Sequence, residues 1–576
     1  MFSGSPAFSR SPKEAVFVQT LLCSTKLTQN VDLLSLLQWK AHPERISEAL
    51  GRVLRLDGEE LVKFLQDILD ALFSMFHTED GNSTAHSGLV FQVLVSIFSL
   101  LEDSKFEHFK PVMDAYISGH FAAALVYKGL LSSVQHCADW VTAAEKQEPI
   151  IKCFRSLEYI FKFIIQSRLL FARATAGQYE DSFKRDLYCV FAALNKMLGI
   201  PYEMVLHSQI ALLYSISAVF EQLVAVLPVL EVAKLACTML DSVPREPPLQ
   251  LTQAKLTAIK NLTTSLLFRE DNESRNLLLV TMCRHLRIHL VRREELRSCT
   301  EILGEILSFL YKRGRDTNKV NNCIQHDVET LCLSILDVLI QTILIVINTS
   351  GPVLGCLVAC LIGLLQLLDE YHYVRLWEEL AHTGERKPLK DFLLRVFLVL
   401  RDLVRQEVFP PDWLVIRMQA NSIILKSLQE LAQPLASQAS FDSQLWSTYF
   451  NLAVAYLTQP SLQLEQFSEV KREKIIEKYR DMRVFMGFQI LSMWNHLGDR
   501  KLEFIPGMVG PFLEVTLVPE SELRKATLHI FFDMMECEQR ARGSFKSVES
   551  ELIDKLDILI SENKGDDEYR QLFNTM

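Results

Sequence analysis

Apolar residues recur at helical spacing along almost the whole chain, and this periodicity constrains the fold more than any other feature. The segment from Asp57 to His77 shows it most clearly. Its apolar stripe consists of Leu61, Phe64, Leu65, Ile68, Leu69, Leu72, Phe73 and Phe76. Asp57 followed by Glu60 resembles a capping box at the start of this helix. Alternating strand patterns bounded by hairpin turns are nearly absent, so the sequence predicts an all-α protein.

The length of the chain determines how such helices can share a core. With 576 residues it exceeds the roughly 250–300 residues at which single cores stop growing. Helix pairs that stack in a row can form a longer, continuous core, because each pair buries its apolar stripe against its neighbours. We expect long single helices near residues 109–135, 148–175, 207–240 and 468–497, among others. Neither a tetratricopeptide nor an ankyrin signature is present, and we expect an irregular armadillo- or HEAT-like solenoid.

The proline-rich stretch from Ser242 to Gln250 is the best candidate for a break between two helical blocks. We therefore expect an N-terminal block at residues 16–242 and a C-terminal block at 251–565. Residues 1–15 are polar and lack a hydrophobic region, which indicates a linker or a disordered start rather than a targeting peptide.

Residues 331–368 contain two apolar runs around a short polar turn and could be taken for a transmembrane hairpin. A membrane span needs about 20 predominantly apolar residues. Asp337 and Gln341 interrupt the first run, and the second, from Val353 to Leu368, has only 16 residues. We favour two buried solenoid helices over membrane insertion.

The charge balance argues against nucleic acid as a partner, because the formal net charge is -10. Basic residues do cluster near the C-terminal end, and the cluster consists of Lys471, Arg472, Lys474, Lys478, Arg480 and Arg483. Acidic residues are interleaved with them, which favours a solvated helix face with i,i+4 ion pairs over a binding patch.

Searches for catalytic motifs find neither a phosphate-binding loop, a dinucleotide fingerprint, a zinc-protease motif nor a nucleophile elbow. His285 and His289 lie four residues apart and could hold a metal, but nearby arginines would repel a cation, so we expect a surface histidine pair. The twelve cysteines include no Cys-x-x-Cys pair, which is typical of buried, reduced cysteines in a cytosolic protein. We expect no catalytic, cofactor-binding or metal-ligating residues and no cofactor.

Aromatic residues at helical spacing are the remaining candidates for a binding site. Phe106, Phe109, Met113 and Tyr116 could anchor a partner helix, but every repeat needs such a stripe and we favour the core.

Several long strings resemble the middle region of the dedicator of cytokinesis (DOCK) family of guanine-nucleotide exchange factors. Four lie in the first third of the chain: FVQTLLCSTKLTQN (17–30), LVKFLQDILDALF (61–73), LLEDSKFEHFKPVMDAYI (100–117) and EYIFKFIIQSRLLFARATAGQ (158–178). Three lie near its end: LQLEQFSEVKREKIIEKYRDMRVFMG (462–487), KLEFIPGMVGPFLEVTLVPESELR (501–524) and ELIDKLDILISENKGDDEYRQLFNTM (551–576). The sequences of these segments are most similar to the subfamily that includes the modifier of cell adhesion.

The resemblance implies a helical-repeat scaffold between a lipid-binding domain and an exchange region that acts on Rac or Rap GTPases. Residues 566–576 resemble the truncated start of that exchange region, so we expect no exchange activity from this chain alone. The implied partners are the GTPase and the ELMO adaptor, both through regions missing here, other domains of the same protein, and a second copy in a homodimer. The resemblance also implies a cytoplasmic protein that is recruited to the plasma membrane through the missing lipid-binding domain, with a role in cytoskeleton regulation. Two alternatives remain, an independent armadillo-like adaptor module and a membrane protein built on residues 331–368.

Overall fold

The computed structural model describes residues 18, 28–78, 82–201, 203–315, 322–349, 351–381, 387–406, 410, 412–437, 441–562 and 564–575. Within this part of the chain the regular structure is helical, and the β-type pairing is one isolated bridge between His77 and Ser83. The predicted all-α class is therefore confirmed. The predicted linker at 1–15 lies outside the described residues.

The chain divides into two compact units, Met1–Leu251 and Thr252–Met576, and the division falls at the start of α13. Pro244, Pro247 and Pro248 lie in the connection that precedes this helix. The predicted blocks at 16–242 and 251–565 stay predictions, as does the assignment of residues 566–576, which include α28.

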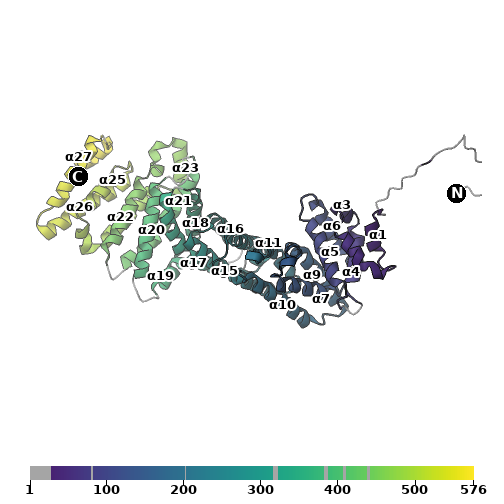
Figure 1. Ribbon diagram of the computed structural model, residues 1–576. Helices are drawn as coiled ribbons and strands as arrows, with labels where there is room; N and C mark the ends of the chain where they lie inside the picture. The colour runs from purple at the N-terminus through teal and green to yellow at the C-terminus, as the bar shows by residue number, and fades with distance from the viewer. Residues whose placement is uncertain are drawn as a thin grey trace, which may run out of the picture. The chain divides into compact units, whose positions relative to one another are not determined.

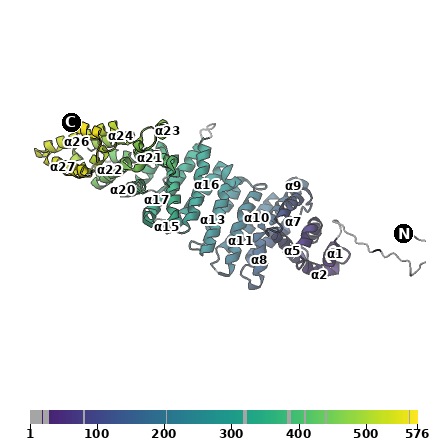
Figure 2. The same cartoon turned by 90° about the horizontal axis from the view of Figure 1, so that it is seen from above.

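Unit 1 contains twelve α-helices among its described residues. They are α1 (Val31–Leu37), α2 (Ile46–Val53), α3 (Gly58–Lys63), α4 (Leu65–Phe76), α5 (Ser87–Leu100), α6 (Lys110–Gly119), α7 (Val126–Asp139), α8 (Gln147–Arg155), α9 (Leu157–Ala174), α10 (Glu180–Leu198), α11 (Leu206–Leu223) and α12 (Val229–Ser242). Many of them pack against the helix three places further on: α1, α4, α7 and α10 form one row, and α2, α5, α8 and α11 form another. Figure 2 shows α8 beside α11. A three-helix period is typical of armadillo repeats.

Unit 2 begins with α13 (Leu249–Thr264) and continues through α14 (Leu266–Arg269), α15 (Asn272–Arg292), α16 (Leu296–Arg315), α17 (Asn322–Val346), α18 (Pro352–Leu367), α19 (Glu370–Ala381), α20 (Lys387–Arg405), α21 (Leu414–Ser437), α22 (Ser443–Thr458), α23 (Glu469–Tyr479), α24 (Met482–His496), α25 (Val509–Thr516), α26 (Ser521–Arg542), α27 (Lys546–Ser561) and α28 (Asp567–Thr575). Two layers run through it. One contains α15, α17, α20, α22, α25 and α27, and the other α16, α18, α21, α24 and α26, with each helix packed against the next in its layer. In Figure 1, α17, α20 and α22 lie side by side. This two-helix period is HEAT-like, so the predicted helical-repeat solenoid is confirmed.

Short 3-10 helices join some of these elements. They are η1 (Pro43–Arg45), η2 (Glu107–Phe109), η3 (Ala144–Lys146), η4 (Glu203–Val205), η5 (Ile347–Thr349), η6 (Pro460–Leu462), η7 (Leu464–Gln466) and η8 (Gly498–Phe504).

The four long helices expected from the sequence are each divided in two. The stretch 207–240 breaks before α12, where Pro228 is the N-cap and cannot continue a helix. The stretch 468–497 breaks at Arg480, whose φ of 59° lies outside the helical region. The stretch 148–175 breaks at Ser156, and 109–135 breaks after Gly119. Periodicity alone missed these breaks because the apolar stripe continues across them.

The stripe between Asp57 and His77 is buried as expected, although it belongs to two helices, α3 and α4. The predicted capping box is only half correct. The Asp57 carboxylate accepts a hydrogen bond from the Glu59 amide at 3.4 Å, whereas Glu60 pairs with Lys63 instead of reaching back to Asp57.

Residues 331–368 fall in α17 and α18, and both helices are packed on several sides. The helix α17 contacts α15, α18 and α20, and α18 contacts α16 and α21. By length and composition, two helices in the described residues are able to cross a membrane, Glu203–Leu223 and Cys323–Val346, and a bent pair, α18 with α19, would make a third. In Cys323–Val346, 61% of the most apolar window is buried by other helices.

Candidate functional site

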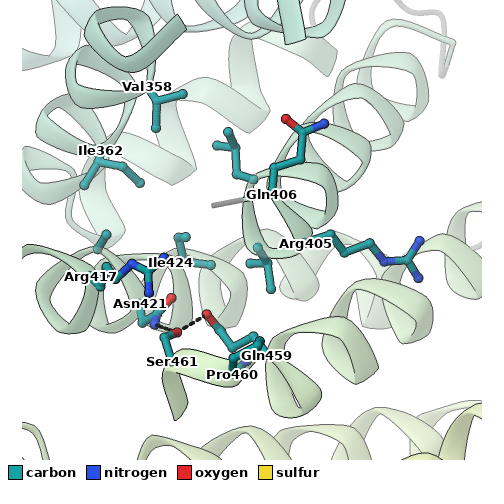
Figure 3. A pocket seen from close by; sticks show the side chains of 13 residues that line it. Val358, Ile362, Arg405, Gln406, Arg417, Asn421, Ile424, Gln459, Pro460 and Ser461 are labelled. Carbon is teal, nitrogen blue, oxygen red and sulfur yellow. Dashed lines mark hydrogen bonds between the residues drawn. The ribbon is translucent and has the colours of Figure 1, made fainter. Parts of the chain in front are cut away.

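A pocket in unit 2 lies between α18, α20, α21 and η6, and Figure 3 shows it from close by. Its volume is about 100 Å³. The lining residues are Val358, Ile362, Leu403, Val404, Arg405, Gln406, Arg417, Ala420, Asn421, Ile424, Gln459, Pro460 and Ser461. Val358 and Ile362 stand on one side, and Asn421, Gln459 and Ser461 on the other. The pocket thus has an apolar wall from α18 that faces a polar wall from α21 and η6.

The polar wall is a closed ring of hydrogen bonds. The Asn421 amide donates to Ser461 Oγ at 3.1 Å, and the Ser461 hydroxyl donates to Gln459 Oε1 at 2.6 Å. The Gln459 amide then donates to the Tyr456 carbonyl at 2.9 Å, and the Tyr456 hydroxyl donates to the Asn421 carbonyl at 2.8 Å. Because these groups satisfy one another, the ring fixes η6 against α21 and α22.

The chemistry of this pocket is that of a binding site. Its thirteen lining residues include neither a carboxylate, a histidine nor a cysteine, and the Ser461 hydroxyl is hydrogen-bonded to an amide that cannot act as a base. A volume of about 100 Å³ is far below the roughly 300–1,000 Å³ of small-molecule sites.

A wider groove, of about 710 Å³, lies between the end of α22, α25 and α27. Leu513, Leu517 and Leu559 contribute apolar surface to its lining, and two lysines, Lys555 and Lys564, also line it. Two glutamates, Glu514 and Glu562, line the same groove, so its charges are mixed.

A buried arginine in unit 2 forms ion pairs with two partly exposed acidic residues. Arg524 lies 1% exposed in α26, and its guanidinium donates to the Asp566 carboxylate at 2.7 Å and to Glu568 at 3.3 Å. These hydrogen bonds from Arg524 lower the pKa of Asp566. Because Asp566 directly precedes α28, the contact anchors that helix to α26.

The expected surface pair of His285 and His289 is wrong, because both side chains are buried in α15. Burial is the main reason that the pKa of His289 falls to about 4, and the charges of Lys255, His285 and Arg292 contribute to this fall. The nearest acid is Glu294, with Oε2 3.6 Å from His289 Nδ1. Among the described residues, no three His, Cys, Asp or Glu side chains are grouped as metal ligands would be.

The aromatic stripe in the segment around α6 is mostly core, as we favoured. Phe106, Met113 and Tyr116 are buried, and Phe109 is half-buried. The Tyr116 hydroxyl donates to Asp70 Oδ1 at 2.7 Å, which connects α6 to α4.

In the basic cluster at 471–483, Lys471, Lys474, Lys478 and Arg480 are exposed along and just after α23, Arg472 is half-buried, and Arg483 is buried. Arg483 is 3% exposed and pairs with Asp481 at 2.7 Å and with Glu465 at 2.9 Å. The predicted solvated face is therefore wrong for Arg483, which is a structural residue at the start of α24.

Sequence reasoning also missed the buried Lys255 in α13 and the polar ring around Asn421. Lys255 is 3% exposed, and burial is the main reason that its pKa falls to about 8. Only the position of Lys255 on the apolar face of its helix could have indicated its burial. The ring around Asn421 joins residues about 40 positions apart, and no local pattern predicts it.

The fold and these pockets define a helical-repeat protein that offers binding surfaces. The chain belongs to the dedicator of cytokinesis family: the family model described as "Dedicator of cytokinesis (DOCK) TPR region" matches residues 42–576. The chain is 43% identical to human dedicator of cytokinesis protein 3, over 99% of this chain and 29% of that protein. It is 42% identical to human dedicator of cytokinesis protein 4, over 98% of this chain and 29% of that protein.

The chain thus spans about 29% of the length of these relatives. The similarity to proteins 3 and 4 confirms the family and subfamily that the sequence resembles.

Proposed function

We propose that this chain is the scaffold segment of a guanine-nucleotide exchange factor for Rho-family GTPases such as Rac, or for Rap. Its role is structural: it holds a lipid-binding domain and an exchange region of the same protein at a defined spacing. The single observation that carries the proposal is the match of residues 42–576 to one region of one family.

The packing within each unit supports a mechanical role. In a helical-repeat stack each helix contacts its neighbours in the row, so bending requires many contacts to change together. The buried contacts of Arg524 and Arg483 add directional constraints between helices. A chain of this kind transmits orientation, which a flexible linker cannot do.

The partners follow from the same proposal. The GTPase would be engaged by the exchange region, and the ELMO adaptor by a region outside the scaffold. The whole protein would reside in the cytoplasm and reach the plasma membrane through its lipid-binding domain. The proposal also includes a homodimer of the whole protein, without assigning its interface.

A chimera tests the scaffold role. In human dedicator of cytokinesis protein 3, the matching segment is replaced by this chain, or by a Gly/Ser linker of equal residue number. Nucleotide exchange on Rac and on Rap is measured in solution and on vesicles that carry the GTPase and phosphoinositide. The scaffold proposal expects the chimera to retain exchange on vesicles and the linker variant to lose it while retaining exchange in solution. Equal rates for the two variants on vesicles would contradict it.

A second measurement uses the isolated chain with Rac and fluorescent GDP. We expect no acceleration of GDP release, because residues 42–576 match a single region of the family and the proposal assigns exchange to a different region of the protein. Clear acceleration would contradict the scaffold-only role.

A further inference from the structure

The helix α23 belongs to neither of the two layers of unit 2. It packs chiefly on α21, and Figures 1 and 2 both show it next to that helix. Its buried residue is Ile475, at 7% exposed, whereas Val470 is 62% and Ile476 42% exposed. Because α23 buries so little apolar surface, the hydrophobic core gains little from its presence.

A buried arginine fixes both ends of the segment that carries α23. Arg483 Nη1 donates a hydrogen bond to Glu465 Oε2 in η7, before the helix, at 2.9 Å. Arg483 Nη2 donates to Asp481 Oδ2, just after the helix, at 2.7 Å. The Arg483 side chain is only 3% exposed, so these charge-assisted hydrogen bonds are shielded from water. The chain therefore leaves the layers and returns to them at fixed points.

The exposed charges of α23 form two rows of opposite sign. At 3.6 residues per turn, three lysines fall within about 60° of one another around the helix, and three glutamates fall within about 80° on the neighbouring part of its surface. The lysine row consists of Lys471, Lys474 and Lys478, and the glutamate row of Glu469, Glu473 and Glu477. The exposed Val470 lies between the two rows.

This spacing puts like charges, not opposite ones, at i,i+4. Glu473 lies four residues from both Glu469 and Glu477, and Lys474 lies four from Lys478, so these neighbours repel each other. Within the described part of the chain, no residue of either row forms an ion pair, and the i,i+4 pairs favoured by the sequence do not form here. Lys478 instead stands over the Tyr479 ring, 5.0 Å from its centroid. A partner of opposite charge would relieve the repulsion within each row.

The closeness of the two rows decides which kind of partner fits the lysine row. Both rows lie on one helix, whose diameter with side chains is about 10–12 Å. A bilayer or a nucleic acid extends beyond this width, so its phosphates meet the glutamate row as well, and repulsion offsets attraction. A protein helix with a single row of carboxylates contacts the lysine row alone. The three lysines span about 10 Å along the axis, or two helical turns, and carboxylates at i, i+3 and i+7 repeat over the same length.

We propose that the lysine row of α23 is a docking surface for an acidic helix of a protein partner, with carboxylates at i, i+3 and i+7. Each carboxylate pairs with one ammonium group, and Val470 packs against the apolar stems of the partner's side chains. This surface requires neither a GTPase nor an exchange region, so it does not depend on the proposed scaffold role.

A synthetic probe tests the surface on the whole chain. The probe is a fluorescein-labelled, alanine-rich helical peptide with glutamates at i, i+3 and i+7, and its control has the same composition with the glutamates spread around the helix. Fluorescence anisotropy should show that the probe binds at least fivefold more tightly than the control. Raising the salt from about 50 mM to about 300 mM should weaken the binding, since exposed charges are screened. Hydrogen exchange should slow in α23 when the probe binds.

Variants locate the contact on α23. Lys474→Glu combined with Lys478→Glu should weaken binding of the probe at least tenfold. The matched control is Lys128→Glu combined with Lys234→Glu, which makes the same change of net charge at two exposed lysines of unit 1 and should leave the affinity unchanged. Circular dichroism verifies that each variant is folded. Equal binding of the probe and its control peptide, or equal losses in the two double variants, would overturn the proposal.

Two further measurements distinguish other occupants of the lysine row. Wild type should not bind phosphatidylserine vesicles, and vesicle binding that Lys474→Glu with Lys478→Glu abolishes would replace the acidic helix by a membrane. Sedimentation equilibrium of wild type and of the same double variant should give equal masses. A dimer that only the wild type forms would identify a second copy as the occupant and overturn the proposal.

Discussion

The guanidinium of Arg275 in α15 donates a hydrogen bond from Nε to Oδ2 of Asp327 in α17 at 2.6 Å, and both side chains are almost completely buried. Burial raises the pKa of Asp327 even though the hydrogen bond from Arg275 opposes this change. Desolvation therefore outweighs the attraction, and we expect the pair to add little net stability compared with a well-packed apolar pair.

The burial of this pair predicts that replacing Asp327 alone lowers the free energy of unfolding more than replacing Arg275 and Asp327 together. Asp327→Ala leaves a buried arginine without its carboxylate and should lower the free energy of unfolding by about 3–5 kcal/mol. The double variant Arg275→Met with Asp327→Leu should recover most of that loss. Urea unfolding followed by tryptophan fluorescence measures both. Lys525→Met, which removes the exposed pair with Glu522, is the control and should cost less than about 1 kcal/mol. A double variant as unstable as Asp327→Ala would contradict this account.

His289 predicts a loss of stability in mild acid. Its folded pKa, about 4, lies below the ordinary value of 6.5, so the unfolded chain binds the proton more tightly. The stability that the neutral side chain retains at pH 7 is lost as the pH falls from about 6.5 towards 4, and the full effect is about 3 kcal/mol. The difference in unfolding free energy between pH 7 and pH 5 should shrink by about 2 kcal/mol in His289→Leu. The exposed His108 provides a matched control, since His108→Leu should keep the wild-type pH dependence.

Lys255 predicts a gain of stability when its charge is removed. Because its folded pKa, about 8, lies below the ordinary value, the folded state is penalised at any pH where the ammonium is charged. Stability should therefore rise as the pH increases from about 8 towards 10.4. Lys255→Met should raise the free energy of unfolding at pH 7 by about 2 kcal/mol and should flatten this rise. Lys260→Met on the same helix, half exposed and paired with Glu301 at 2.7 Å, should not stabilise. If the two variants behave alike, burial of Lys255 is not the cause.

Two helical glycines in unit 1 predict opposite effects of the same substitution. A Cβ at Gly129 would lie 2.5 Å from Cε1 of Phe76, a ring that is 1% exposed. Gly129→Ala should therefore destabilise by about 1–3 kcal/mol. Gly51 has nothing within 4 Å of a built Cβ, and Gly51→Ala should stabilise by about 0.5–1 kcal/mol through helix propensity. Thermal unfolding by circular dichroism distinguishes the two, and a stabilising Gly129→Ala would refute the predicted clash.

Much of the fold was predictable because helical periodicity is a local property. The stripe from Leu61 to Phe76 shows on the sequence which face of each helix is buried, and the structure buries all eight residues. The helix α2 was not expected, because it is only 8 residues long, although Ile46, Ala49, Leu50 and Val53 fall at helical spacing within it. The division at Arg480 was missed because a single residue with positive φ leaves the apolar pattern intact.

The candidate pocket was much less predictable than the helices. Its polar wall joins Asn421 to Ser461 and Tyr456 to Asn421 across different helices, and none of these residue types signals a site on its own. His285 and His289 had the spacing of a site, but their burial depends on how α15 packs, which spacing does not reveal.

The sequence by itself determined the all-α class, the family and the buried face of most helices, because spacing along one chain and similarity to relatives require no knowledge of contacts. Tertiary structure alone decided that helices pack in a three-helix period in unit 1 and in two layers in unit 2. It also decided that Arg275 meets Asp327 and that Lys255 is buried. These results depend on which helix surfaces face each other, and that choice is made by packing and desolvation between segments distant in the sequence.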